Sequence, residues 1–332
     1  MDHGFVTFGR GAGEDAGSAG ALRDEHPTPD PLVAKQWGLK RIGAPRAWTR
    51  ASQSEVPIAI IDTGIMEHPA IVASLGPERY NALTRENEAD ADGKAHGTKI
   101  ASIMAAAWDG KGIMGVMNGA RLLPVRAFTI ENARDEFACP RPHEPCSRVL
   151  ELVDAIRWAV EHGARVINAS WGQRGANSRV LRDAIAAAQD RALFVVAAGH
   201  GRIDLDDDEA RPFYPAAWGN ELPNVLTVMQ TNEADEPEGP YGKTRVHLAA
   251  PGIQIWTTDG SAGYDVVSGT SFATAFVSAA AALTWSRPAF SSHTPEQLRA
   301  LLVDRAARFP RPSLAGKCRA GAVLDIGFLA ET

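Results

Sequence analysis

Three short segments of the sequence each contain a side chain that can take part in nucleophilic catalysis. Asp62 follows an apolar run in IAIIDTGI (58–65), His96 begins HGTKIASIMAA (96–106), and Ser271 lies in SGTSFATAFVSAAAAL (268–283). Taken alone, each residue has an ordinary explanation as a turn aspartate, a helix cap or an N-cap serine. Taken together, a carboxylate can orient an imidazole, and that imidazole can remove the proton of a hydroxyl.

The segment around Ser271 is more particular than a helix cap requires. Small residues dominate it, which lets a helix pack closely against a sheet. The first turn of that helix directs backbone N–H groups and the positive end of the helix dipole towards a developing negative charge. We therefore expect Ser271 at the buried start of a helix, close to other polar groups.

His200 is a further unusual position, in FVVAAGHGRID (194–204). An apolar run ends at Gly199, and the imidazole follows at once. The plain interpretation is a polar residue that begins a loop. The alternative is a second functional histidine.

Strand and helix patterns alternate along the chain, from short β-branched runs to apolar residues at helical spacing. The expected strands are 56–61, 121–128, 165–169, 192–198, 225–229 and 247–250, and the expected helices are 96–107, 150–161, 180–191, 270–285 and 294–307. This order predicts an α/β fold, a three-layer, doubly wound, mostly parallel sheet with helices on both faces. Sites in such sheets form at the carboxyl ends of the strands, where Asp62, Ser170 and His200 would lie.

Composition narrows the classes of partner. The chain has 332 residues, 45% of them hydrophobic and 22% charged, with a net charge of −6. This charge argues against nucleic acid or an anionic membrane as a partner. No apolar stretch reaches the roughly 18 residues of a membrane span. The N-terminus lacks the pattern of a signal peptide, so we expect a cytoplasmic location, or secretion if a leader precedes this sequence.

Two regions differ in composition. Residues 1–30 are rich in Gly, Ala, Asp and Glu and end in PTPDP, so we expect a flexible N-terminal extension, a candidate short pro-segment. Residues 31–332 are expected to form one folded domain.

The three cysteines, Cys139, Cys146 and Cys318, are too few for a disulfide framework. Cys139 and Cys146 flank PRPHEP. The sequence allows three states for them: free thiols, a local disulfide, or a zinc site that includes His143 but lacks a fourth ligand.

The chain resembles the subtilisin-like serine proteases, the subtilases. DTG, HGT and GTSFATA are close to the three signature blocks of that family and come in its order, Asp, His, Ser. The resemblance runs from about residue 31 to 329, and includes QWGLKRIGAPRAW, PVRAF, VINASWG, FYPAAWGN, LAAPG and GAVLDI. It implies that 31–332 is a subtilisin-like peptidase domain.

The resemblance also implies roles for particular residues. Ser271 is the nucleophile, His96 the general base and Asp62 the residue that orients the imidazole. The substrate-binding segments are Ser170, Trp171 and Gly172, together with Ala198 and Gly199. An extended peptide or protein substrate would pair there by backbone hydrogen bonds. The Trp171 side chain is expected to form a wall of the cleft, with core packing as the alternative.

His200 departs from the family pattern. The family has Ala-Ala-Gly-Asn where this chain has Ala197-Ala198-Gly199-His200, and that asparagine donates to the oxyanion. We expect His200 to donate in its place. The alternatives are that it points away and leaves a slower protease, or that the position has no catalytic use.

The acidic run Asp204–Glu209 has three interpretations: a solvated loop, a source of preference for Arg or Lys before the cut, or a calcium site. The chemistry requires no cofactor, no metal ligand is assigned, and structural calcium is optional. The extension could block the cleft, which would be autoinhibition.

We expect a serine endopeptidase that processes a specific peptide or protein. The alternative is a catalytically weak subtilase-fold module that binds extended peptides.

Overall fold

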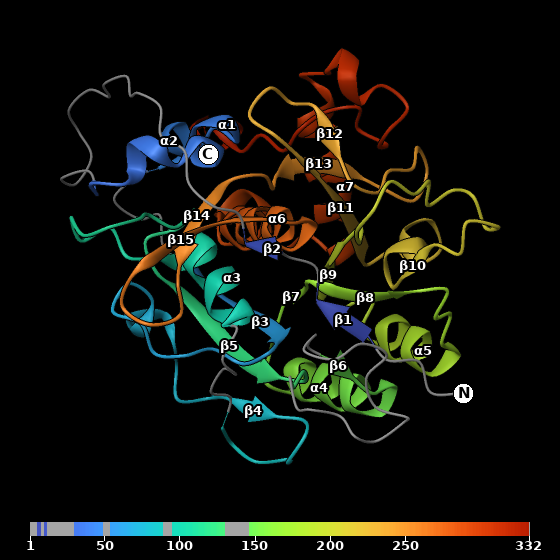
Figure 1. The fold of residues 1–332 in the computed structure, drawn as a ribbon, viewed down its shortest axis with the longest axis horizontal. Coiled ribbons are helices and arrows are strands. Elements are labelled where there is room, and N and C mark those ends of the chain that lie inside the picture. Colours follow the sequence, from blue (N-terminus) through green and yellow to red (C-terminus); the bar gives the residue numbers. More distant parts are fainter. Residues whose placement is uncertain are drawn as a thin grey trace.

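The computed structural model describes residues 5–7, 10–11, 30–48, 54–88, 95–129 and 146–331. Its centre is an eight-stranded sheet with the order β12-β11-β9-β7-β3-β5-β4, and β13 lies beside β11 (Figure 1). The strands are β3 Ser54–Asp62, β4 Tyr80–Asn81, β5 Ala120–Arg126, β7 Val166–Ala169, β9 Leu193–Ala197, β11 Val225–Thr231, β12 Pro237–Glu238 and β13 Leu248–Pro251. Every pair is parallel except β11–β12. This confirms the expected fold class.

Helices cover both faces of the sheet. They are α3 His96–Ala105, α4 Val149–Glu161, α5 Arg179–Ala187, α6 Thr270–Trp285 and α7 Pro295–Ala307, with the short α1 Trp37–Arg41 and α2 Ala44–Ala47 near the C-terminus (Figure 1). The side chains of β3 point alternately to the two faces of the sheet, so a hydrophobic core forms on each face. Ile58 and Ile60 join the core with α3, α6 and α7, while Ala59 and Ile61 join the core with α4 and α5.

Helix α6 is buried along its whole length, as are strands β7 and β9. All of its side chains from Thr270 to Trp285 are buried. Alanines at most of the contact positions let it approach β3, β7, β9 and β11 together. The Ser54 hydroxyl donates to the Ala282 carbonyl at 3.2 Å and ties the far end of the helix to the start of β3. The helix is therefore a rigid support for its first residues.

Two small sheets lie beside the main one. One has the order β10-β8-β1-β6 and the other β14-β15-β2. Their strands are β1 Phe5–Thr7, β2 Arg10–Gly11, β6 Cys146–Ser147, β8 Trp171–Arg174, β10 Phe213–Tyr214, β14 Ile255–Thr258 and β15 Tyr264–Ser268. Strands β1 and β2 differ from the expected flexible extension. Their sequence has no strand periodicity, and pairing with distant strands supplies their backbone hydrogen bonds.

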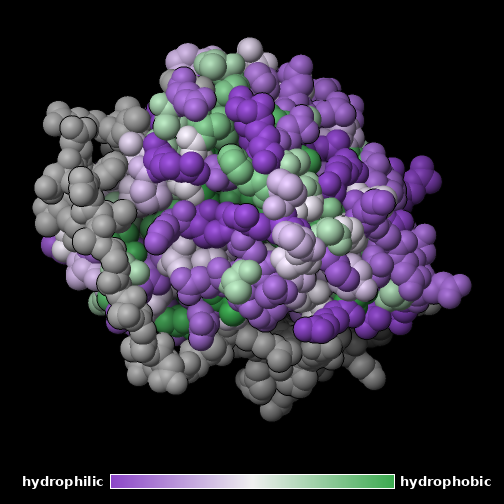
Figure 2. Space-filling view, turned by 90° about the horizontal axis from the view of Figure 1, so that it is seen from above, coloured by the Kyte–Doolittle hydropathy of each residue, from purple (hydrophilic) through white to green (hydrophobic). Residues whose placement is uncertain are grey.

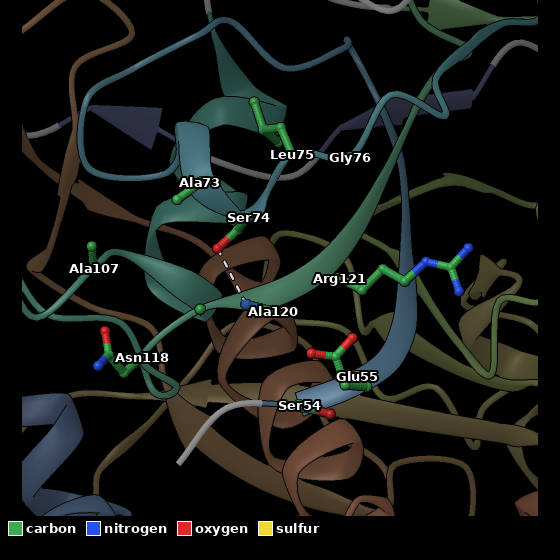
Figure 3. Close-up of a pocket in the computed structure, with 11 residues that line it drawn as sticks. Ser54, Glu55, Ala73, Ser74, Leu75, Gly76, Ala107, Asn118, Ala120 and Arg121 are labelled. Carbon is green, nitrogen blue, oxygen red and sulfur yellow. Dashed lines mark hydrogen bonds between the residues drawn. The ribbon is translucent and has the colours of Figure 1, made fainter. Parts of the chain in front are cut away.

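A pocket of about 370 Å³ lies at the amino-terminal edge of the main sheet (Figure 3). Ser54, the first residue of β3, and Ala120, the first of β5, line it, with Glu55 and Arg121 also at its wall. Because β3 and β5 are parallel, this pocket is at the opposite end of the strands from Asp62. It is therefore separate from the predicted site.

The surface seen from above is mostly hydrophilic, with apolar residues visible in small areas between polar ones (Figure 2). The exposed large apolar side chains of the described ranges belong to four separate segments: Val72, Leu150, Val180 and Phe309. In the same ranges, no helix combines the length and the apolar character needed to cross a membrane.

His247 is fully buried between β11 and β13. The Thr227 N–H donates to its Nδ1 at 3.0 Å, which fits a neutral ring. Burial, and then the cations Arg299 and Arg319, hold the pKa of His247 well below its ordinary value of 6.5. The folded protein thus resists protonation there, while the unfolded chain takes up a proton near pH 6.5.

We predict that His247 makes the fold less stable as pH falls below 6.5. The unfolded state then binds more protons than the folded state, so the free energy of unfolding decreases by up to about 1.4 kcal/mol per pH unit. In urea unfolding between pH 5 and 7, His247→Gln should show a shallower pH dependence, whereas the control His293→Gln should keep the wild-type slope. An unchanged slope in His247→Gln contradicts this prediction.

Candidate active site

A buried carboxylate–imidazole pair lies at the carboxyl end of β3. Asp62 is the last residue of the strand and is fully buried. His96 begins α3, and its Nδ1 lies 2.8 Å from Asp62 Oδ1 and 3.0 Å from Oδ2. Asp62 Oδ1 also accepts from the Thr63 N–H at 2.8 Å. The aspartate therefore fixes the imidazole with a proton on Nδ1, which leaves Nε2 as the basic nitrogen.

The glycine after His96 makes this approach possible. A Cβ atom on Gly97 would lie 2.2 Å from the Gly64 carbonyl oxygen and 3.2 Å from Asp62 Cβ. The Gly97 N–H donates to Thr63 Oγ1 at 3.2 Å. The DTG turn and the HGT helix start thus pack directly on each other, and only glycine fits between them.

Ser271 is the second residue of α6 and is fully buried. Its hydroxyl donates to the Ser170 carbonyl at 3.2 Å, and the Ser170 hydroxyl donates to the Ser271 carbonyl at 3.1 Å. The His96 ring lies 5.7 Å, centroid to centroid, from that of Phe272, the residue after Ser271. The structure thus brings Asp62 and His96 into contact beside the start of α6. The serine hydroxyl is directed to Ser170 in this arrangement.

His96 Nε2 is buried and has no hydrogen-bond partner among the described residues. A buried polar atom without a partner is costly, and such atoms gather at functional sites. Nε2 is the nitrogen that a general base presents to its nucleophile.

Buried hydroxyl and amide groups hold Ser271 and Ser170 in place. Asn168 Nδ2 donates to Ser170 Oγ at 2.9 Å, and Ser278 Oγ donates to Asn168 Oδ1 at 2.9 Å. Thr270 Oγ1 donates to the Gly199 carbonyl at 2.8 Å. The ends of β7 and β9 are therefore tied to the first turns of α6. Asn168 and Ser278 were not expected from the sequence, although a polar residue within the apolar strand VINA was a signal.

His200 is half-buried and follows Gly199, the carbonyl of which accepts from Thr270. Gly199 has φ +108°, and a Cβ there would lie 2.4 Å from the Phe213 ring. The His200 and Phe213 rings lie 4.8 Å apart, centroid to centroid. His200 therefore stands at the carboxyl end of β9, one residue past the contact with α6, and packs on an aromatic ring.

The residues expected to bind substrate are buried or are paired through their backbone. Ser170 and Ala198 are fully buried, and the Ala198 N–H donates to the Val228 carbonyl at 2.9 Å. Trp171 and Gly172 begin β8, where their backbone pairs with β1.

The Trp171 side chain corrects the expectation of a cleft wall. It is fully buried, and its ring lies 6.0 Å from that of Phe128 in the core with α4 and α5. This is the core-packing alternative. Strand β7 ends at Ala169 and β8 begins at Trp171, so the alternation of side chains along β7 does not continue through Ser170. The sequence pattern therefore did not indicate to which side the Trp171 ring points.

The acidic run has uses within the fold. Asp206 accepts hydrogen bonds from the Thr244 N–H at 2.9 Å, the Thr244 hydroxyl at 2.7 Å and the Arg245 N–H at 3.0 Å. Asp208 forms an ion pair with Arg245 at 2.6 Å. These contacts account for two of the carboxylates without a basic substrate or a calcium ion.

Within the described ranges, no cluster of three or more His, Cys, Asp or Glu side chains could hold a metal. Cys318 is buried and free, and burial raises the pKa of its thiol. The alternatives for Cys139, His143 and Cys146 depend on side chains that lie outside the described residues.

The fold and site together define a class of protein, the α/β serine hydrolases with a carboxylate–imidazole pair at the carboxyl ends of the strands of a parallel sheet. The model of the subtilase family matches residues 53–321, and the chain belongs to this family. It is a subtilisin-like serine endopeptidase, as the relatives described next also indicate.

Two relatives illustrate the similarity. The chain is 29% identical over 268 residues to Subtilisin Savinase of Lederbergia lenta, covering 77% of this chain and 88% of the relative. It is 30% identical over 313 residues to Fervidolysin of Fervidobacterium pennivorans, covering 84% of this chain and 41% of the relative. The chain thus spans less than half of this longer relative.

Solved structures agree on the fold. The crystal structure of fervidolysin superposes with a TM-score of 0.78 and 22% identity, covering 99% of this chain and 51% of that one. A protease from Pseudoalteromonas arctica superposes with a TM-score of 0.73 and 22% identity, covering 92% of this chain and 98% of that one. At these identities the likeness establishes the fold.

We predict that Gly97→Ala weakens both the fold and the site. The new methyl group overlaps the Gly64 carbonyl, so α3 must shift away from Asp62, at a cost of about 1–3 kcal/mol. Urea unfolding and the rate of fluorophosphonate labelling measure the two effects. The control is Gly76→Ala, where a Cβ meets nothing within 4 Å. Wild-type stability and labelling in Gly97→Ala would contradict the packing described here.

Proposed function

We propose that this protein cleaves peptide bonds with Ser271 as nucleophile, His96 as general base and Asp62 as the residue that orients His96. The observation that carries the proposal is the buried Asp62–His96 hydrogen bond at 2.8 Å, beside the helix that begins with Thr270 and Ser271. No cofactor enters this chemistry. A structural calcium ion and the expected cytoplasmic location stay predictions.

The serine must turn before it reacts. Rotation about its Cα–Cβ bond takes Oγ away from the Ser170 carbonyl and towards His96 Nε2. Such a rotation takes the side chain from one staggered rotamer to another across a single eclipsed barrier and breaks one neutral hydrogen bond. Catalytic hydrogen bonds are often absent before substrate binds, so the present orientation of Ser271 is compatible with activity.

The reaction then has two halves. Ser271 Oγ attacks the peptide carbonyl carbon as His96 Nε2 takes the hydroxyl proton. The imidazolium is stabilised by Asp62 and gives the proton to the leaving amine nitrogen as the C–N bond breaks. Water then attacks the ester, with His96 as base again, and frees the acid product and the serine.

The oxyanion formed in each half needs hydrogen-bond donors. In the first turn of α6 the Phe272 and Ala273 N–H groups donate to the Gly269 carbonyl, so we propose the Ser271 N–H as the backbone donor, with the helix dipole adding positive potential. We propose that His200 donates a ring N–H as well, in the position where the family has asparagine. The support is its location at the end of β9, one residue after the Gly199–Thr270 contact.

A second candidate function is a module that binds extended peptides and reacts slowly. The hydrogen bond from Ser271 to the Ser170 carbonyl favours it, because the hydroxyl is then turned away from its base. That this endopeptidase processes one specific peptide or protein stays a prediction.

We predict that a fluorophosphonate probe labels the wild-type protein and that Ser271→Ala abolishes labelling. His96→Ala should slow it by at least about 10³-fold, because the hydroxyl loses its base. The binding-module alternative predicts the absence of labelling together with retained peptide binding, which fluorescence anisotropy would detect.

We predict that His200→Ala lowers kcat by about 10–10³-fold with little change in KM, since an oxyanion donor acts mainly in the transition state. His200→Asn should retain most of the activity, because an amide can donate from the same place. The control is His162→Ala, a histidine at the end of α4. An unchanged kcat in His200→Ala would overturn this role.

A further inference from the structure

The hairpin of β14 and β15 connects the helix that carries His96 with the helix that carries Ser271 (Figure 1). Strand β14 packs along α3, and β15 ends at Ser268, three residues before Ser271. The two strands pair antiparallel along their whole length. The hairpin is therefore a structural connection between the proposed base and the proposed nucleophile.

The base of this hairpin is fastened to the turn that leads into α6. The Gln254 N–H donates to the Ser268 hydroxyl at 3.0 Å, and the Gly269 N–H donates to the Gly252 carbonyl at 2.8 Å. The two segments pack closely, because a Cβ atom on Gly252 would lie 3.0 Å from the Gly269 carbonyl oxygen. A displacement of the hairpin therefore moves the start of α6, and Ser271 with it.

The hairpin contacts α3 along one face of the helix. The contacts are at Ala95, Lys99 and Ser102, and their spacing of four and then three residues places them on one helical stripe. From the turn of the hairpin, a Cβ atom on Gly260 would lie 2.2 Å from the Ala95 Cβ. From β14, the Thr258 N–H donates to the Ser102 hydroxyl at 3.2 Å. Both contacts are short and place the hairpin directly on the helix that His96 begins.

Lys99 makes the middle contact with a charged group. Its Nζ lies 2.6 Å from Asp265 Oδ2 on β15, and only 15% of its side chain is exposed. The other carboxylate oxygen, Oδ1, accepts from the Val266 N–H at 2.7 Å, which fixes the carboxylate against its own strand. Partial burial protects such a pair from screening by salt. Because Lys99 lies about one turn after His96, the pair joins the helix of the base to the strand that leads to the nucleophile.

We propose that Lys99 and Asp265 are positioning residues, which hold the start of α6 at the separation from α3 that lets the Ser271 hydroxyl reach His96. Neither is a catalytic residue, because both act through the hairpin. Asp62 holds His96 from the opposite side at 2.8 Å, so loss of the ion pair loosens the nucleophile and leaves the carboxylate–imidazole pair in place. The inference rests on the proposed endopeptidase function.

The first experiment measures burst kinetics with p-nitrophenyl acetate, a small ester that releases nitrophenolate when it acylates the serine. Lys99→Met and Asp265→Asn each remove one charge and nearly keep the size of the side chain. We expect each to lower the saturating acylation rate about 10–100-fold, because a misplacement of about 1 Å costs up to about 10²-fold. The ester concentration that gives half of that rate should stay nearly constant. The double variant should fall no further than the slower single variant, since all three lose the same interaction.

The matched control is Arg41→Met, which removes an ion pair of nearly the same length and burial. Arg41 lies 2.5 Å from Asp235, and 16% of its side chain is exposed. This variant should keep the wild-type acylation rate under conditions where urea unfolding shows every variant to be folded. The positioning role is overturned if Lys99→Met loses no more acylation rate than Arg41→Met, or if the losses of the two single variants multiply in the double variant.

The second experiment keeps both charges and displaces the hairpin. Gly260→Ala adds a methyl group that overlaps Ala95, so the hairpin must move away from α3, and the acylation rate should fall at least about fivefold. The matched control is Gly163→Ala. Gly163 has φ +82° and Gly260 has φ +90°, so both variants carry a similar backbone strain, but a Cβ on Gly163 meets nothing within 4 Å. Equal acylation rates in these two variants contradict a coupling between the hairpin and the site.

The wild-type protein separates this inference from the proposed function. If the wild type shows neither a burst with p-nitrophenyl acetate nor labelling by a fluorophosphonate, the endopeptidase function fails, and the positioning role fails with it. If the wild type reacts with both probes while Lys99→Met, Asp265→Asn and Gly260→Ala react at the wild-type rate, the positioning role alone is wrong and the endopeptidase function stands.

Discussion

The structure depends on one close contact, the packing of the turn after β3 against the first turn of α3. Asp62 and His96 share a hydrogen bond of 2.8 Å inside the core, where water does not weaken it. The contact exists because Gly97 lets two backbones meet. The long parallel sheet and the layers around it serve to bring these two segments, 34 positions apart, to the same place each time the chain folds.

The second half of the site is organised by α6. Hydrogen bonds from Asn168, Ser278 and Thr270 join its first turns to the ends of β7 and β9. Strands β8 and β15 adjoin Ser170 and the start of α6, and the amino-terminal strands β1 and β2 pair with them.

The sequence alone predicted the fold class and the main strands and helices. It did not predict contacts between residues that are far apart along the chain. Asp62, His96 and Ser271 lie in signature blocks, and the structure brings the first two into contact while the Ser271 hydroxyl is directed to Ser170. The core strands and helices follow strong local patterns, so local pattern sufficed for the fold. Asn168 and Ser278 gain meaning only when β7 and α6 are packed together. Trp171 begins a new strand after Ser170, and β1 and β2, of three and two residues, are too short to show a period. Their pairing is a property of the folded chain.

The complete burial of α6 links catalysis to thermal adaptation. The same sixteen-residue helix that fills the centre of the core also carries the nucleophile on its second position. A substitution that loosens the core to give activity at low temperature therefore also makes the position of the Ser271 side chain less well defined. Evolution of this enzyme towards a new working temperature is expected to proceed at the surface and in loops, while the alanines of this helix stay fixed.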